Sequence, residues 1–271
     1  MLSIFDDYTT NQIVWIAISV FSVGIGKGGF PLGGLSLPLL ILVWPEQASA
    51  ARSVVAFLLP LLSAMDIVSL IFYRKHIEWR RIVPLIPGTL FGVAVASVLF
   101  VSDSASLVSM SDRVLKILIG SIGIVFVGFK IANKWIVTKI QTSSAAAMPG
   151  KLRSFVMGSG AGVLSTISHS AGPVAIMYFV PQNLGKLKLA GTMAGFFWGL
   201  NLVKLLPFGL LGRLELGNLL LGIWMLPVIP FGVGTGYLLV RLLKEKHYMG
   251  LVYVALSITS LLLIRRAIVG G

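Results

Sequence analysis

The chain of 271 residues contains no cysteine and few acidic residues. Without cysteine there is no disulfide framework and no thiolate metal or redox centre. Aspartate and glutamate together number nine, charged residues make up 11% of the chain, and 56% of it is hydrophobic. This balance excludes an ordinary soluble globular domain. The composition indicates a polytopic membrane protein.

Long apolar runs fill most of the sequence, and several reach the ~20 residues that cross ~30 Å of hydrocarbon. No soluble domain of useful size is left between them, so we predict one integral membrane domain, residues 1–271. The runs lie at 13–26, 35–44, 53–72, 83–101, 114–129, 153–167, 172–180, 189–208, 218–240 and 249–264.

The net charge of +13 could suggest a nucleic-acid partner. The cations, however, lie in short loops between the apolar runs, which is the pattern of positive-inside orientation. We therefore expect a lipid bilayer and no nucleic acid. The N-terminus carries Asp6 and Asp7 and no basic residue before the first run, unlike a cleaved signal peptide.

Two apolar stretches, about half the chain apart, are interrupted by glycine, proline and polar residues. The first interruption runs from Gly24 to Pro38 and the second from Gly158 to Pro173. Backbone without helical hydrogen bonds is tolerated at membrane depth only where protein buries it or a cavity lies beside it. A matched pair of such breaks in two halves indicates the binding site of a transporter.

The two halves correspond in the order of their features. Pro38 and Pro45 match Pro173 and Pro181, Asp66 matches Asn201, Glu78 matches Glu215, and Ile86-Pro87 matches Ile229-Pro230. We predict repeat 1 over residues 1–132, a cytoplasmic linker over 133–152 and repeat 2 over 153–271.

The length of the first broken segment bears on the topology. As one helix, residues 13–44 would extend for about 48 Å at ~1.5 Å per residue, too far for one comfortable crossing. If both broken segments are re-entrant, each half crosses three times with opposite topology. The cationic loops 73–82, 130–153, 181–188 and 241–248 then lie inside, and outside lie Arg52, Arg113, Arg213, Arg265 and Arg266.

If both broken segments cross instead, the 241–248 cluster moves outside, against the positive-inside bias. We therefore predict an all-α polytopic membrane protein. It consists of two inverted repeats, each a broken or re-entrant helical hairpin plus three transmembrane helices.

Ionisable groups within membrane segments cost about 2.5–3.5 kcal/mol at the bilayer centre, so each suggests a function. Lys27 lies in the first break beside Gly28 and Gly29, where backbone N–H groups can approach an anion. Ser36 could add a hydroxyl donor. The alternative is that Lys27 reaches the lipid headgroups.

The second break is rich in hydrogen-bond donors, namely Thr166, Ser168, His169 and Ser170. Histidine changes charge near neutral pH. His169 would therefore line a substrate site, carry a proton, or remain neutral and bond a backbone carbonyl in a tight turn.

The remaining candidates are Asp66, Asn201 and Lys204. Asp66 and Lys204 would form a buried ion pair that holds the halves in register. Alternatively, Lys204 would supply positive charge to a substrate site while Asp66 compensates that charge or accepts a proton. The sequence leaves both interpretations open.

Other features suggest structural roles. The spacings Gly88-x3-Gly92 and Gly232-x-Gly234-x-Gly236 are typical of close helix packing. Aromatic residues near the ends of runs suggest interfacial anchors, namely Trp44, Tyr73, Trp79 and Trp135. We find no set of nucleophile and base, no metal-ligand spacing and no cofactor motif. We expect no enzyme, no metal and no cofactor.

At its two breaks the chain resembles the TauE/SafE family of membrane permeases, the sulfite exporter-like proteins. The resemblance covers nearly the whole chain and is closest from Gly24 to Pro38, followed by Leu39-Leu40. In the second half the family usually has a run of glycines before the proline, whereas this chain has Ser168-His169-Ser170-Ala171-Gly172-Pro173. The resemblance implies outward movement of sulfite, sulfoacetate or related organosulfonates across a bacterial inner membrane.

The prediction is therefore a multi-pass inner-membrane transporter of small sulfur-containing anions that works by alternating access. The expected site residues are Lys27, Gly28, Gly29, Ser36, Thr166, Ser168, His169, Ser170, Asn201 and Lys204, with Asp66 and His169 for coupling or charge compensation. The alternatives are a proton-coupled importer of organic anions or another small solute, and an intramembrane enzyme that uses His169 and Asp66. A homodimer is left open.

Overall fold

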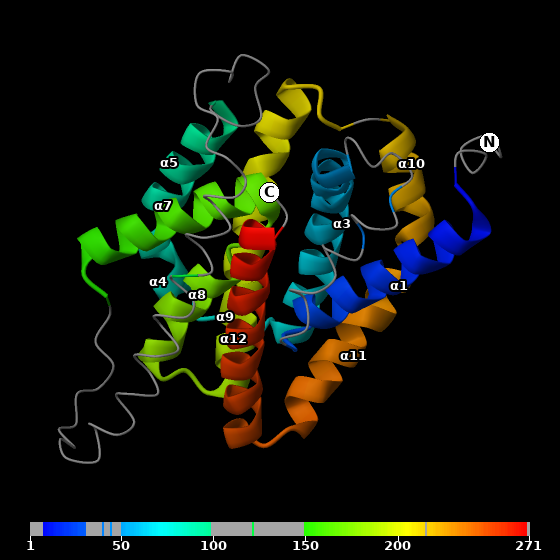
Figure 1. The fold of residues 1–271 in the computed structure, drawn as a ribbon. Helices are drawn as coiled ribbons and strands as arrows, with labels where there is room; N and C mark the ends of the chain where they lie inside the picture. Colours follow the sequence, from blue (N-terminus) through cyan, green and yellow to red (C-terminus); the bar gives the residue numbers. More distant parts are fainter. Residues whose placement is uncertain are drawn as a thin grey trace.

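The computed structural model describes residues 8–30, 40, 44, 50–98, 121, 149–214 and 216–269. Within these residues every element is a helix (Figure 1), as the sequence predicts. The first half contains α1 (Thr10–Lys27), α3 (Ala50–Tyr73), α4 (Trp79–Ile82), η3 (Val83–Leu85) and α5 (Ile86–Ala96). The second half contains α7 (Lys151–Ser168), α8 (Gly172–Phe179), η7 (Val180–Gln182), α9 (Lys186–Leu210), α10 (Leu216–Met225), α11 (Val228–Leu242) and α12 (Glu245–Val269).

Two of the described helices are long and apolar enough to cross a membrane, Ser53–Tyr73 and Lys186–Leu210. A third candidate is the pair Leu219–Met225 and Val228–Leu242, whose axes bend by 54° at a short break. The prediction of a helical membrane protein is confirmed at this level. The count of three crossings in each half stays a prediction.

Both predicted breaks begin inside a helix and contain its end, because α1 continues through Gly24 and α7 continues through Gly158. Helix α1 ends at Lys27, and Gly29 follows with φ +96°, a backbone conformation that favours glycine. Helix α7 ends at Ser168, His169 adopts a left-handed conformation with φ 51°, and α8 begins at Gly172 with Pro173 in its first turn. The remainder of the first break, including Ser36 and Pro38, lies outside the described residues.

The helices of the two halves pack in a reciprocal pattern. Helix α1 lies along α11, α7 lies along α5, and α3 packs against α9 between these two pairs (Figure 1). Each outer pair therefore joins the first helix of one half to a later helix of the other half.

Glycine makes both outer pairs possible, because their backbones nearly touch. A Cβ atom at Gly28 would lie 2.3 Å from the carbonyl oxygen of Val233, and one at Gly92 would lie 2.1 Å from that of Ser159. The predicted packing role is confirmed for Gly88, Gly92, Gly232 and Gly236, because each would place a Cβ atom within 3 Å of the partner helix's backbone. It is wrong for Gly234, where the nearest atom to an added Cβ is in the Phe72 side chain, 3.8 Å away.

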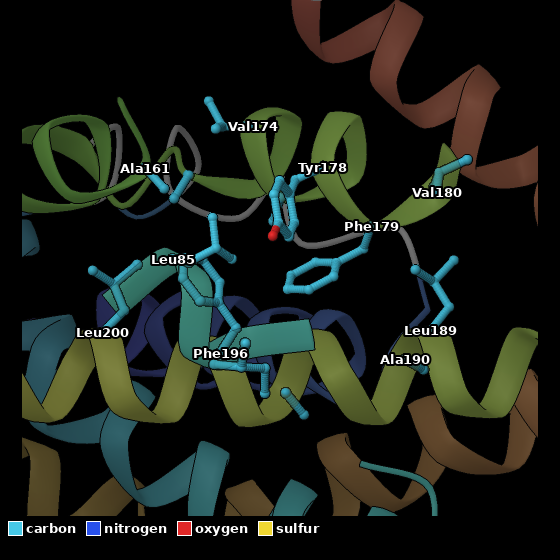
Figure 2. Close-up of a cluster of buried hydrophobic side chains, with 14 of the residues drawn as sticks. Leu85, Ala161, Val174, Tyr178, Phe179, Val180, Leu189, Ala190, Phe196 and Leu200 are labelled. Carbon is cyan, nitrogen blue, oxygen red and sulfur yellow. The ribbon is translucent and has the colours of Figure 1, made fainter. Parts of the chain in front are cut away.

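The largest apolar cluster among the described residues gathers around α8 and α9 and also includes residues of α3, α5, α7, α11 and α12. Figure 2 shows Phe179 of α8 directed toward Phe196 of α9, with ring centroids 5.8 Å apart. A second cluster joins α1, α3 and α11 through Val20, Met65 and Val233.

Three of the loops predicted to be cytoplasmic meet at one end of the molecule. Lys188 Nζ lies 2.6 Å from Glu78 Oε1, and Arg81 donates to Gln182 Oε1 at 3.2 Å. The Lys186 ammonium donates to the carbonyl oxygens of Arg241 and Leu243. The hydrogen bond from Lys188 lowers the pKa of the Glu78 carboxyl. Loops 73–82, 181–188 and 241–248 therefore share one face.

Two of the predicted interfacial aromatic anchors are instead buried. Trp44 is 3% exposed and packs on Phe57, and Tyr73 is fully buried. Trp79 is 47% exposed, as an anchor requires, and Trp135 lies outside the described residues. Proximity to the end of a run did not distinguish an aromatic residue that packs inward from one that faces lipid.

Candidate anion-binding site

The end of α1 meets α3 and α9 in a buried polar cluster. Lys27 Nζ lies 2.6 Å from Asp66 Oδ1, and Asn201 Nδ2 donates to Asp66 Oδ2 at 2.6 Å. Asp66 is fully buried and Asn201 is 2% exposed. The carboxylate thus has one cation and one amide as partners, which satisfies both of its oxygens.

Helix α9 presents three residues of this cluster at helical spacing. Phe197, Asn201 and Lys204 are separated by four and three positions, so they share one face of the helix. The Phe197 ring lies 5.0 Å from Lys27 Nζ and offers that cation its π face. The face of α9 that is directed at α3 and α1 therefore carries its share of the polar cluster.

Lys204 is fully buried and is held by the C-terminal turn of α7. Its ammonium donates to the Ser165 carbonyl at 3.0 Å, to Ser165 Oγ at 2.8 Å and to His169 Nδ1 at 2.9 Å. These three acceptors use all three N–H groups of a lysine. The partial negative charge at the end of α7 further favours a cation there.

The left-handed turn after α7 directs the His169 ring back across the cluster. Its Nε2 lies 2.9 Å from the Val55 carbonyl of α3. A carbonyl only accepts, so Nε2 carries a proton and Nδ1 accepts from Lys204. His169 therefore bonds a backbone carbonyl, as one interpretation predicted, but that carbonyl belongs to the other half and the ring also contacts Lys204.

The predicted ion pair between Asp66 and Lys204 is wrong in its cation. Asp66 pairs with Lys27, and Lys204 takes neutral acceptors on α7. Lys27 is also not directed to the headgroups, because its side chain is only 14% exposed. The sequence placed all these groups at depth, but spacing along one helix could not show which lysine on another element reaches the carboxylate.

Hydroxyl groups cover the last carbonyls of α1. Ser69 donates to the Lys27 carbonyl at 2.9 Å, Tyr73 to that of Gly28 at 2.7 Å and Tyr248 to that of Gly29 at 3.0 Å. Carbonyls at a helix end have no partner within the helix. Side chains from α3 and α12 supply the partners that water would give elsewhere.

The other predicted site residues have varied surroundings. Thr166 donates its hydroxyl to the Gly162 carbonyl one turn earlier, inside α7. The Ser170 backbone N–H donates to the Leu164 carbonyl at 3.2 Å. Gly28 and Gly29 form the turn that carries Lys27. The side chains of Ser36 and Ser168 lie outside the described residues.

Several residues of the cluster escaped sequence reasoning. Ser165, Ser69, Phe197 and the hydroxyls of Tyr73 and Tyr248 are ordinary residues within apolar runs, and only the fold brings them to the breaks. The position of Ser165, one helical turn before His169 on α7, was the single available signal.

The arrangement brings two lysines and one aspartate together, and Asp66 and Lys204 are fully buried. Lys27 and Asp66 neutralise each other, while the described partners of Lys204 are uncharged. Burying an ammonium without a counter-ion costs free energy that an incoming anion would offset.

Comparison with known families decides the assignment. A family model described as Sulfite exporter TauE/SafE matches residues 13–263. The chain belongs to the TauE/SafE family. The match covers both halves and the polar cluster from Lys27 to Lys204. No curated protein and no solved structure matches the chain.

Membership of the TauE/SafE family carries a coarse function with it. The family consists of sulfite exporter-like integral membrane permeases, so this chain is a membrane transporter of the sulfur-anion type. A transporter family agrees with the expectation of no enzyme. The geometry also gives no support to an enzyme built on His169 and Asp66, because the two side chains have separate partners.

Proposed function

We propose that this TauE/SafE protein exports a small sulfur oxyanion, sulfite or an organosulfonate, through the polar cluster between α1, α3, α7 and α9. The observation that carries the proposal is Lys204, fully buried and held by three uncharged acceptors. A buried cation without a carboxylate partner creates a place where a transported anion gains more than it loses by leaving water.

The inverted arrangement of the two halves is part of the proposal. Its support is the reciprocal packing of α1 with α11 and of α7 with α5. Asp66 and Asn201, which match in the two halves of the sequence, also contact each other directly. Corresponding residues meet in this way when they lie near a pseudo-twofold axis. Helices α3 and α9 run antiparallel, since Val55 packs near Phe208 while Tyr73 lies beside Gly191.

We place the face with loops 73–82, 181–188 and 241–248 in the cytoplasm. These loops carry most of the described cations, and cytoplasmic loops are enriched in lysine and arginine. The contact of Lys186 with the carbonyls of Arg241 and Leu243 supports a common side for the last two loops. The bacterial inner membrane is the location that suits this orientation.

Outward flux suits the electrical energy of such a membrane. One negative charge that leaves a cell with a negative interior gains about 2.3 kcal/mol per 100 mV, so export needs no coupling ion. Alternating access would come from movement of the pairs α1/α11 and α5/α7 relative to α3 and α9. Each pair is held internally by backbone contact at glycine and can move as a unit.

Flux measurements on the purified protein in liposomes test the proposal. Sulfite and methanesulfonate are loaded inside, and an imposed potential of either sign is applied without a pH gradient. We expect efflux in response to the potential and at least a tenfold loss in Lys204→Met, which keeps the length of the side chain and removes its charge. Lys188→Met, in an exposed ion pair outside the cluster, serves as the matched control and should transport like the parent.

Absence of flux under potential alone, with recovery when a pH gradient is added, would reject uncoupled export. It would favour the second candidate, a proton-coupled importer of organic anions. Equal flux in Lys204→Met and the parent would reject the site itself.

A further inference from the structure

The charge balance of the cluster bears on which anions it accepts. The cluster holds two lysines and one aspartate, and Asp66 is already within 2.6 Å of Lys27. Because a carboxylate at that distance neutralises Lys27, only Lys204, whose described hydrogen-bond partners are uncharged, can give an anion a positive charge of its own. We infer that this site selects anions with a single negative charge over dianions, and that Asp66 sets this selectivity by neutralising Lys27. The inference rests on the proposed function.

The position of Asp66 fixes which lysine is neutralised. Asn201 donates to Oδ2 of the carboxylate, which leaves Oδ1 directed at Lys27. The Phe197 ring holds Lys27 from another side, and Ser69, on the same helix as Asp66, bonds the Lys27 carbonyl. Lys27 is therefore fixed against Asp66 through both its side chain and its backbone.

Lys204 is kept separate from that pair by its own acceptors. Ser165 and His169 hold its ammonium toward the end of α7, where the carbonyl ends of the helix carry a partial negative charge. That partial charge supports the cation in the empty protein but does not cancel a full unit. A monoanion completes the neutralisation, whereas a dianion leaves one buried negative charge unpaired.

The second negative charge of a dianion would also face Asp66. The carboxylate is fully buried, so water screens it little and the repulsion between like charges is strong. A monovalent sulfonate or hydrogensulfite therefore fits the cluster, and sulfate, the sulfite dianion and sulfoacetate fit it poorly.

Binding of methanesulfonate and of sulfate to the full chain in detergent, at fixed ionic strength, tests the inference. The two anions are both tetrahedral and differ by one unit of charge. We expect the parent to bind methanesulfonate at least tenfold more tightly than sulfate. In Asp66→Asn, which keeps the shape and the amide contacts, two lysines are uncompensated, and the ratio should shift at least tenfold toward sulfate.

If Asp66 only stabilises the fold, Asp66→Asn lowers the stability of the protein and leaves the ratio of the affinities for methanesulfonate and sulfate unchanged. Equal binding of the two anions by the parent, or an unchanged ratio in a folded Asp66→Asn, would overturn the inference and leave the proposed function standing. If the parent binds neither methanesulfonate nor sulfite, both the inference and the proposed function are overturned.

If Asp66→Asn does not fold, Lys204→Met provides the second measurement, with Lys188→Met as its control. The inference requires Lys204→Met to lose methanesulfonate binding at least tenfold. Retained binding in that variant would show that Lys27 holds the anion and would overturn the inference.

Discussion

Single side chains decide how the first break is closed. The Tyr73 hydroxyl, fully buried on α3, donates to the Gly28 carbonyl, and Tyr248 does the same for Gly29. The φ of Gly29 lies where only glycine is comfortable, and a Cβ atom there would approach the Tyr73 hydroxyl to 2.8 Å. The described part of the break, as far as Phe30, thus contains a turn with its own hydrogen-bond partners.

Removal of one such hydroxyl should weaken the protein measurably. Tyr73→Phe leaves the Gly28 carbonyl buried without that donor, which costs about 1–3 kcal/mol. We expect a lower thermal unfolding midpoint in detergent. Tyr178→Phe is the comparison, because its partner Ser154 also has the Pro149 carbonyl within reach, and it should cost less. Equal midpoints for Tyr73→Phe and the parent would show that the carbonyl finds another partner.

At the scale of elements, the glycine contacts of α1 with α11 and of α5 with α7 matter most. Helices in lipid lack a hydrophobic drive to associate, so close backbone approach supplies the van der Waals contact that holds them. Gly236 would place a Cβ atom 2.2 Å from the Ile25 carbonyl oxygen, and Gly92 has the same relation to Ser159. The close approach of the helices in each pair therefore requires glycine, because the Cβ atom of any other residue would overlap the backbone of the partner helix.

Adding that methyl should separate the helices. Gly92→Ala and Gly236→Ala are each expected to destabilise the protein by about 1–3 kcal/mol through overpacking. Gly199→Ala, with no atom within 4 Å of the added Cβ, is the matched control within a helix and should be neutral or slightly stabilising. Unfolding midpoints of the three variants check this. If Gly199→Ala lowers the unfolding midpoint as much as the other two variants do, overpacking against the partner helix does not explain the loss of stability.

At the scale of the molecule, contacts between distant parts of the chain bring loops 73–82, 181–188 and 241–248 to the same end of the protein. Glu78 meets Lys188, and Lys186 meets the segment after α11. The end that carries these loops is opposite the end where the turn of Arg213 joins α9 to α10 (Figure 1). The protein therefore has one strongly cationic end.

Because the chain has no cysteine, single-cysteine labelling can test this orientation directly. In intact cells, an impermeant maleimide should label Arg213→Cys and leave Lys75→Cys and Lys244→Cys unlabelled until the membrane is opened. The positive-inside bias gives the reason. Labelling of Lys244→Cys from outside would reject the inverted arrangement, since that loop changes side when each broken segment crosses.

The sequence by itself determined the class of the protein. Its apolar runs, its lack of cysteine and its two glycine-rich breaks predicted a helical membrane permease, and the family match confirms the expected family. The breaks were predictable because glycine, proline and polar residues interrupt helices locally, whatever lies around them. Lys27, Asp66, His169 and Lys204 could also be selected from the sequence, because an ionisable residue within an apolar run is visible without knowledge of the fold.

Only the tertiary structure decided which of these groups are partners. Lys27 rather than Lys204 reaches Asp66, and Ser165 and Phe197 join the cluster from within apolar runs. Pairing of charges depends on distances between helices that are far apart along the chain, and no local pattern encodes those distances. The packing of α1, α3, α7 and α9 places one carboxylate against one lysine and leaves the other lysine with neutral acceptors.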